Sequence, residues 1–344
     1  MSRVQTIEIA SGDGGQRLDR YLKRLFPQLG QGRIEKMCRK GELRIDGGRV
    51  KASTRVEAGQ VLRVPPLPDP DAPKPAPEID ERDAAMIQEA VIYRDDHIIA
   101  LNKPPGLPVQ GGSKLTRHVD GLGAALRFGL DANPRLVHRL DKDTSGVLIM
   151  ARTRAVAADL TEAFRHRATR KIYWAAVAGV PHPKAGVIKY GLVKAKGHGK
   201  AGEGEKMHVV HPDEVMNTEG AKRATTEFAT IEALGKRAAW MALVPVTGRT
   251  HQLRAHMAAL GHPIAGDGKY GGSSQENLGD GWGAGLGGAL SKKLHLHARS
   301  LTVEHPVTGA MLHLSAPLPA HMARTWAELG WKPSDAPLDP FEEL

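Results

Sequence analysis

The chain of 344 residues has very little cysteine and no long apolar run. Its one cysteine, Cys38, excludes an intramolecular disulfide framework and a cysteine-based zinc site. So little cysteine fits a reducing compartment. No apolar run approaches the roughly 18 residues of a membrane span. Residues 1–15 lack a charged region followed by an apolar stretch, so we expect no signal peptide. We therefore expect a cytoplasmic protein without membrane attachment.

Acidic residues are outnumbered by basic ones, at 38 against 48, which leaves a net charge of +10. The length allows one large domain with a small second one, and 41% hydrophobic residues predict a sizeable core. Excess positive charge is typical of proteins that bind a polyanion such as nucleic acid. The alternative is a generally basic surface kept for solubility. The clustering of the cations along the chain favours the first interpretation.

Many of these cations fall within residues 15–64, which we predict to form a small module. Apolar residues at helical spacing predict two short helices, with Cys38 as a core residue of the second. Residues 46–48, Asp-Gly-Gly, predict a tight turn between two strands. Such a module can clamp a phosphate backbone, although a solvated basic helix pair is the alternative. The candidate RNA-binding residues are Arg33, Lys36, Arg39, Lys40, Arg44 and Lys51.

Proline marks the boundary after this module. Residues 65–78 are proline-rich and predict an extended spacer. Residues 79–330 then combine strands and helices without regular alternation, which indicates an α+β domain. Residues 331–344 are expected to be a C-terminal tail.

Within residues 79–330 the apolar patterns predict particular elements. Residues 91–101 indicate a hairpin, and residues 147–150, 172–177 and 239–246 indicate strands. Apolar spacing around residues 156–164 and 253–260 predicts two helices. We expect two stretches to be mobile, residues 194–206, which are rich in lysine and glycine, and residues 266–288, which are rich in glycine.

The nine residues 138–146 read HRLDKDTSG, directly before the predicted strand at 147–150. They combine two cations, a carboxylate between them, a hydroxyl pair and a turn glycine. A carboxylate beside cations at the end of a strand is typical of reactive sites, because the cations keep the acid ionised. The string therefore predicts a functional site.

This string closely resembles the HRLDxxTSG signature of the RluA-type pseudouridine synthases. Residues 170–175, RKIYWA, resemble the Lys-x-Tyr-x-Ala strand of the same family. Residues 247–267, TGRTHQLRAHMAALGHPIAGD, resemble its GRTHQLRxHM…GHPIxGD block, and residues 102–104 also fit. The resemblance covers residues 91–317.

Two further similarities concern the substrate. The N-terminal module resembles the small RNA-binding domain named after ribosomal protein S-four. Gly32 stands where that family usually has serine, and residues 45–47 read Ile-Asp-Gly where it usually has Val-Asn-Gly. Residues 110–113 and the pairing of domains resemble the RluC branch, which acts on large-subunit (23S) ribosomal RNA.

The resemblance implies a large mixed, mainly antiparallel sheet with a central active-site cleft. It also implies isomerisation of uridine to pseudouridine in RNA. Nothing is oxidised in that reaction and no group is supplied from outside, so no cofactor is expected. The implied substrate is 23S ribosomal RNA, and we expect a monomer.

The resemblance also implies residue roles. Asp141 becomes the catalytic carboxylate, either as nucleophile or as base at the ribose. Arg254 is its implied cation partner, and Leu253 lines the pocket. Tyr173 offers an aromatic face to the uracil or takes the proton from carbon five. Arg139 fills the space left by an extruded base, and His138 braces the loop.

Three alternatives were weighed against this interpretation. The first is the same chemistry on tRNA, and the second is a non-catalytic RNA-binding factor for ribosome assembly. A glycosidase would need a second carboxylate opposite Asp141, and the matched segments offer none. His251, His256 and His262 lack the i, i+4 spacing and nearby carboxylates of a helical zinc site, so no metal is expected.

Overall fold

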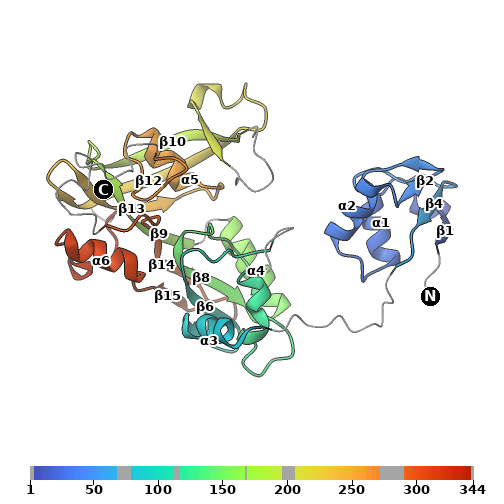
Figure 1. Ribbon diagram of the computed structural model, residues 1–344, viewed down its shortest axis with the longest axis horizontal. Helices are drawn as coiled ribbons and strands as arrows, with labels where there is room; N and C mark the ends of the chain where they lie inside the picture. The colour runs from blue at the N-terminus through green and yellow to red at the C-terminus, as the bar shows by residue number, and fades with distance from the viewer. Residues whose placement is uncertain are drawn as a thin grey trace. The chain divides into compact units, whose positions relative to one another are not determined.

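The structure is a computed structural model, and it describes residues 4–67, 79–111, 117–166, 169–195, 206–271 and 290–341. The chain divides into two compact units, Met1–Glu78 and Ile79–Leu344 (Figure 1). Most of the predicted spacer, residues 68–78, lies outside the described residues, and so does most of each stretch predicted to be mobile. Among the described helices, none is long and apolar enough to cross a membrane.

The first unit contains two helices and a four-stranded sheet of order β1-β4-β2-β3. Both predicted helices and the hairpin are confirmed, with Asp46 and Gly47 in the left-handed region at the turn. The sheet also contains a strand before residue 15, where we expected the module to begin. That strand is mostly exposed and pairs with the last strand, so its pairing is non-local and local periodicity gave no sign of it. The elements are β1 (Gln5–Glu8), α1 (Leu18–Leu25), α2 (Gln31–Lys40), β2 (Arg44–Ile45), β3 (Gly48–Arg49) and β4 (Val61–Val64).

One apolar core holds this unit together, and Cys38 belongs to it as predicted. Ile34 and Met37 bury one face of α2, which leaves the basic residues of that helix exposed. Arg44 differs from the other candidate RNA contacts. Its guanidinium donates to the backbone carbonyls of Gly41 and Gly47 and so holds the hairpin turn. The exposed candidates are Arg33, Lys36, Arg39, Lys40 and Lys51.

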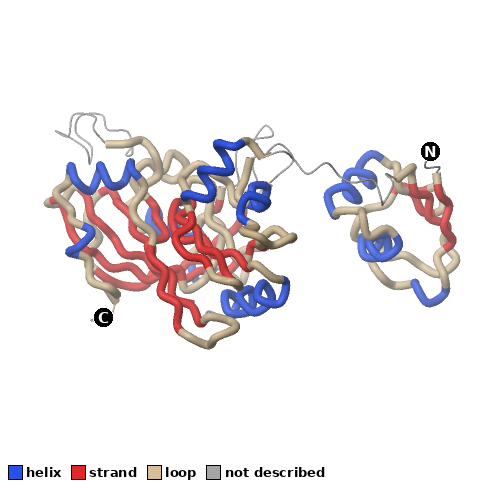
Figure 2. The backbone as a smooth tube through the Cα atoms, turned by 90° about the horizontal axis from the view of Figure 1, so that it is seen from below, coloured by secondary structure: helices blue, strands red, loops and turns tan. Residues whose placement is uncertain are grey.

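The second unit is built on one 11-stranded sheet (Figure 2). Its strand order is β11-β10-β12-β13-β9-β14-β8-β6-β5, with β15 beside β14 and β7 beside β8. Among the described pairs only β14 and β8 are parallel, so the predicted mixed, mainly antiparallel sheet is confirmed. The strands are β5 (Val91–Arg94), β6 (Ile98–Lys103), β7 (Arg135–Leu136), β8 (Ser145–Ala151), β9 (Thr169–Ala178), β10 (Ala185–Lys194), β11 (Met207–Val210), β12 (Lys222–Leu234), β13 (Ala238–Pro245), β14 (Leu296–Glu304) and β15 (Met311–Ser315).

Helices cover this sheet where its strands are buried on both faces. Along β13 successive side chains alternate between two cores, as expected for a strand. Trp240 packs against Trp326 of α6, while Met241 lies in the same core as Met257 of α5. The predicted helices around residues 156–164 and 253–260 are confirmed. The helices of this unit are α3 (Glu81–Glu89), α4 (Arg154–Arg165), α5 (Gln252–Ala259) and α6 (Ala320–Glu328).

The residues expected to form a C-terminal tail pack onto the second unit. Trp331 is buried against Trp240 and Trp326. Asp339 accepts two hydrogen bonds from Arg170, at 2.7 and 2.8 Å. The segment thus fixes Arg170 at the start of β9, a contact that we did not expect of a tail.

A close backbone approach explains the glycine in the string at 138–146. Gly146 has φ 108° and lies on β8, where that strand pairs in parallel with Ala298 of β14. A β-carbon on Gly146 would overlap the Ala298 carbonyl group. Only glycine therefore allows the two strands to pair at this point.

We predict that Gly146→Ala lowers the free energy of unfolding of the second unit by about 2–4 kcal/mol, from a strained φ together with the overlap. Urea-induced unfolding measures the change. Gly129→Ala is the control, because Gly129 also has positive φ but faces open space, and it should cost only about 1 kcal/mol. Equal losses would contradict the assignment to the strand contact.

Candidate active site

A cavity of about 490 Å³ opens in the second unit where the ends of several elements meet. Asp141 approaches from the loop before β8, Tyr173 from β9 and Arg254 from α5. All six site residues that we predicted in this unit, whatever their expected role, line the cavity. Asp141 is the one carboxylate among the described lining residues, and the others are mostly basic, aromatic or apolar. The six predicted residues are His138, Arg139, Asp141, Tyr173, Leu253 and Arg254.

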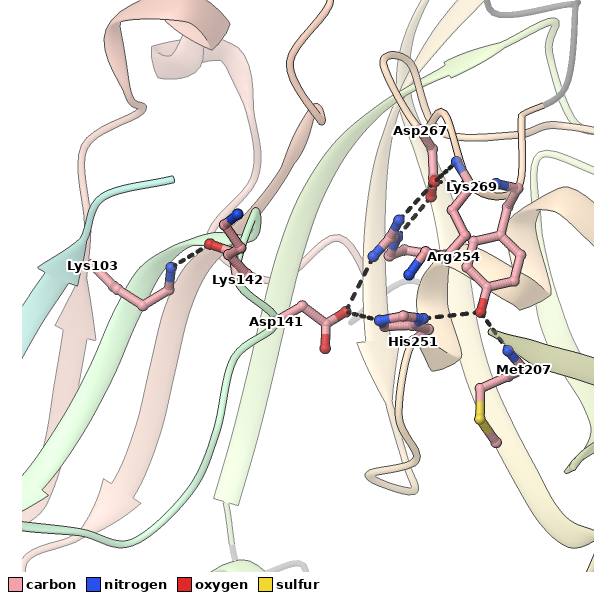
Figure 3. Close-up of polar contacts among 9 residues, drawn as sticks. Lys103, Asp141, Lys142, Met207, His251, Arg254, Asp267 and Lys269 are labelled. Atoms are coloured by element: carbon pink, nitrogen blue, oxygen red, sulfur yellow. Dashed lines mark hydrogen bonds and ion pairs between the residues drawn. The ribbon is translucent and has the colours of Figure 1, made fainter. Parts of the chain in front are cut away.

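A buried lysine holds the loop that carries Asp141 through a hydrogen bond to its backbone. Lys103, at the end of β6, is fully buried and donates to the carbonyls of Pro104 and Leu107. It also donates to the carbonyl of Lys142 (Figure 3). Burial lowers the pKa of Lys103 to about 7, although nearby Asp143 and Asp141 oppose that shift. The sequence matched this lysine to the family without assigning it a role. Its position directly after a buried apolar strand is the signal that could have identified it as a buried cation.

The two acids of the string lie in different environments. Asp141 lines the cavity and is partly buried, with 28% of its side chain exposed. Asp143 is exposed and does not line the described cavity. The backbone N–H of Thr144 donates to the Asp141 carbonyl and closes the turn between them. The turn therefore directs one acid inward and the other toward solvent.

Arg254 joins Asp141 to a second carboxylate that we did not predict as a site residue. Its Nε and Nη2 each donate to Asp267 at 2.7 Å, whereas its Nη1 lies 3.8 Å from Asp141 Oδ2 (Figure 3). Burial lowers the pKa of Arg254, but its hydrogen bonds to Asp267 and the negative charges of Asp267 and Asp141 outweigh burial, so the pKa is raised. The guanidinium remains charged and is shared between both acids.

The expected ion pair of Arg254 with Asp141 is present, and the structure adds a closer carboxylate partner. Arg254 pairs most closely with Asp267, and its contact with Asp141 is an ion pair at longer range. Asp267 lies at the start of a stretch expected to be mobile, yet its side chain is fully buried. It accepts from the backbone N–H groups of Lys269 and Tyr270, because the buried Arg254 charge requires a fixed partner. In the sequence, Asp267 could have been identified as a site residue because it is the one carboxylate in the matched segment 247–267.

His251 is a further neighbour of Asp141 that the sequence interpretation did not include. Its Nε2 lies 3.9 Å from Asp141 Oδ2, and its Nδ1 lies 3.0 Å from the hydroxyl of Tyr270 (Figure 3). His251 precedes α5 with φ 51°, a left-handed conformation that turns the chain into the helix. Burial lowers the pKa of its imidazole, so the ring is neutral at physiological pH.

Tyr173 and His138 complete the inner wall of the cavity. Burial and the charge of Asp141 raise the pKa of Tyr173, so its phenol stays protonated. Burial and Lys171 lower the pKa of His138 to about 3, which keeps that imidazole neutral. His138 Nε2 accepts the N–H of Ile149 in β8, and its ring stacks on Phe164 at 4.4 Å. These two contacts agree with the predicted role of His138 in bracing the loop, which stays a prediction.

Cations extend from the cavity to the protein surface. Arg139 is exposed on the string itself. A second cavity of about 640 Å³ shares lining residues with the first, among them Lys171 and Arg249. Arg165 and Arg170 also line it, with Glu227 as the one acid among its described lining residues. Two of these cations are already paired with acids, Arg165 with Glu162 and Arg170 with Asp339.

A buried histidine anchors the end of the string. Ser145 Oγ lies 2.9 Å from His297 Nδ1, and His297 Nε2 lies 3.1 Å from the carbonyl of Ala316. A carbonyl only accepts, so Nε2 carries the hydrogen and Nδ1 accepts from the serine hydroxyl. Burial lowers the pKa of His297 to about 4, so the ring is neutral.

Comparison with known proteins gives consistent similarities. The family model described as RNA pseudouridylate synthase matches residues 97–259, and that of the S4 domain matches residues 16–62. "Ribosomal large subunit pseudouridine synthase C" of Vibrio cholerae is 34% identical over 95% of this chain and 98% of the relative. The Escherichia coli (strain K12) protein of the same name is 34% identical over 95% of this chain and 97% of the relative.

A solved structure is similar in fold. It is titled "Human RNA Pseudouridylate Synthase Domain Containing 4" and is 30% identical, with a TM-score of 0.58. The similarity covers 72% of this chain and 95% of that one.

We predict that Asp267→Asn lowers the free energy of unfolding by about 3–5 kcal/mol, because it leaves the buried Arg254 charge without its main partner. Asp141→Asn is the matched control on the same arginine. Its side chain is partly exposed and its contact longer, so it should cost less than about 1 kcal/mol. Urea unfolding of both variants measures the difference, and a larger loss for Asp141→Asn would contradict this division.

We predict that His297→Gln weakens the dependence of stability on pH. Between pH 6.5 and 4 the unfolded state binds a proton on His297 and the folded state does not, so acid favours unfolding. Without this group, the slope of unfolding free energy against pH near pH 5 should fall by about 1.4 kcal/mol per pH unit. Denaturant titrations at several pH values measure it. An unchanged slope would mean that the folded protein already binds this proton.

Proposed function

The chain belongs to the RNA pseudouridine synthase family and is an isomerase of that class, and from this premise we propose that it converts uridines to pseudouridine in large-subunit (23S) ribosomal RNA. The single observation that carries the proposal for the site is the cavity itself, in which one carboxylate, Asp141, faces two nearby cationic or hydrogen-bonding side chains. These are Arg254 and His251.

The proposed reaction keeps every atom of the substrate. The bond between N1 of uracil and C1′ of the ribose breaks, the base turns, and a bond forms between C5 and C1′. The hydrogen on C5 leaves as a proton, and N1 takes up a proton. No oxidant, reductant or group donor is involved, so the proposed reaction needs no cofactor. One ionised carboxylate beside the sugar is sufficient to start it.

We assign that role to Asp141, either as nucleophile at C1′ or as base at the ribose. Arg254 supports the assignment because its positive charge lies 3.8 Å from the Asp141 carboxylate in a partly buried site. Asp143 is exposed and lies outside the described lining of the cavity, so it is left without a chemical role.

The other pocket residues act on the base and on the RNA. Tyr173 stacks on the uracil, an interaction typically worth roughly 1–3 kcal/mol per base. Its raised pKa disfavours the phenolate and so favours stacking over direct uptake of the C5 proton. Arg139, exposed at the rim, enters the space that the extruded uridine leaves in the RNA stack. Leu253 packs beside the base, and His138 braces the loop.

RNA binding is assigned to two surfaces, each described by itself. On the first unit, the exposed cations of α2 and of the segment after β3 contact phosphates. On the second unit, the cations around the paired cavities hold the strand near the extruded base. We further propose that the protein acts as a monomer in the cytoplasm, where its ribosomal RNA substrate lies.

The proposal predicts that Asp141→Asn abolishes pseudouridine formation, with a loss of at least about 10³-fold, because the amide can neither attack nor accept the proton. Asp143→Asn is the matched control and should retain nearly full activity. The measurement is pseudouridine content of large-subunit ribosomal RNA, mapped by nucleotide position, after incubation of RNA from cells lacking the gene with each purified protein.

Different outcomes would test different parts of the proposal. An active Asp141→Asn protein would overturn the catalytic assignment. Modification that appears only in tRNA would overturn the substrate and leave the chemistry standing. No modification by the wild-type chain, despite RNA binding, would indicate a non-catalytic factor.

A further inference from the structure

Tyr270 connects both polar neighbours of Asp141. Its hydroxyl lies 3.0 Å from His251 Nδ1, and its ring packs edge-on against that imidazole, with centroids 5.7 Å apart. The guanidinium of Arg254 lies over the same ring, 5.3 Å from its centroid. One aromatic side chain thus touches the two groups that face the carboxylate.

The hydrogens in this chain of contacts have one consistent arrangement. The backbone N–H of Met207, at the start of β11, donates to the Tyr270 hydroxyl at 2.9 Å. A carboxylate only accepts, so the nitrogen of a neutral His251 that faces Asp141, Nε2, must carry the hydrogen. Nδ1 then accepts, and the tyrosine hydroxyl supplies its hydrogen. In the opposite tautomer, the lone pair of Nε2 would face the Asp141 carboxylate.

We propose that Tyr270 is a positioning residue for Asp141, which acts by fixing His251 as the tautomer with hydrogen on Nε2. The relay runs from the Met207 N–H through the Tyr270 hydroxyl and His251 to the carboxylate. Figure 3 shows its two ends, Met207 and Asp141, with His251 beside the carboxylate. This inference rests on the proposed role of Asp141.

The relay gives Asp141 a second fixed hydrogen-bond donor beside Arg254. Arg254 gives Nε and Nη2 to Asp267, so only Nη1 faces Asp141, at 3.8 Å. His251 approaches the same Oδ2 at 3.9 Å. Both contacts are longer than hydrogen bonds in the free protein, and catalytic contacts of this kind commonly shorten when substrate binds. A donor already aimed at Oδ2 sets which lone pairs of Asp141 remain free for the ribose.

Tyr270→Phe tests the hydroxyl alone, because phenylalanine keeps the ring over Arg254 and beside His251. We expect the single-turnover rate of pseudouridine formation to fall roughly 10- to 100-fold, the range found when partners that orient histidines in metal sites are removed. The affinity for ribosomal RNA should stay unchanged, since the surface cations are untouched. Tyr190→Phe is the control, another half-buried tyrosine of the second unit that does not line the cavity, and should retain the wild-type rate.

A double-mutant cycle separates positioning from a structural effect. His251→Asn suits the left-handed backbone at this position but is too short to reach Asp141. Because the hydroxyl acts only through the imidazole, Tyr270→Phe should cause no further loss of rate in the His251→Asn protein. Independent, multiplicative losses in the double variant would overturn the relay. So would a wild-type rate for Tyr270→Phe, or a loss confined to RNA affinity.

A spectroscopic measurement tests the relay without activity. The ¹⁵N shifts of His251 should report hydrogen on Nε2 in the wild-type chain and a mixture of tautomers in Tyr270→Phe, with the signal assigned by its absence in His251→Asn. Hydrogen on Nδ1 in the wild-type chain would overturn the inference. An active Asp141→Asn protein would overturn the proposed function instead, and the ¹⁵N shifts would still decide whether the relay exists.

Discussion

The arrangement of the site depends on how one buried guanidinium is shared. Arg254 donates two hydrogen bonds to Asp267, from Nε and Nη2, each at 2.7 Å. Its third nitrogen, Nη1, lies 3.8 Å from Asp141. A buried charge without a fixed partner destabilises a protein. Asp267 is the fixed partner of Arg254, and Asp141 makes only a longer contact with the same guanidinium. Asp141 therefore lies beside a cation without being held in a short, two-pronged salt bridge. A carboxylate that must meet a ribose needs that freedom.

The sheet brings these groups together from distant parts of the chain. β8 follows the Asp141 loop, β9 carries Tyr173, and β14 lies between them. The parallel contact of β8 with β14 is possible because Gly146 has no side chain. Lys103 then fixes the loop from the buried side through the Lys142 carbonyl. Each constraint is structural, and together they direct one acid of the string into the cavity.

Much of this was accessible from the sequence, because the informative residues lie in short ordered strings. The sequence places Asp141, Tyr173 and Arg254 in one site, and all three line the cavity. Helices with apolar spacing, such as the one around residues 156–164, were also found. These predictions succeed where local pattern and burial agree.

The rest depends on non-local partners that no local pattern encodes. Asp267 and Tyr270 lie at the edge of a glycine-rich stretch that looked mobile, yet burial against Arg254 and His251 fixes them. The first strand of the N-terminal unit is mostly exposed and pairs with a strand far along the sequence. Arg44 counted as an RNA contact by charge alone, although its guanidinium holds a turn.

The most direct test of the central claim is a crystal structure of the full chain bound to its ribosomal RNA substrate. The account predicts one uridine extruded into the cavity, its uracil stacked on Tyr173. The Asp141 carboxylate should then lie about 3–3.5 Å from C1′ or from the 2′ position of the ribose. A bound RNA whose target ribose faces Asp143, or that leaves the cavity empty while contacting only the first unit, would contradict it.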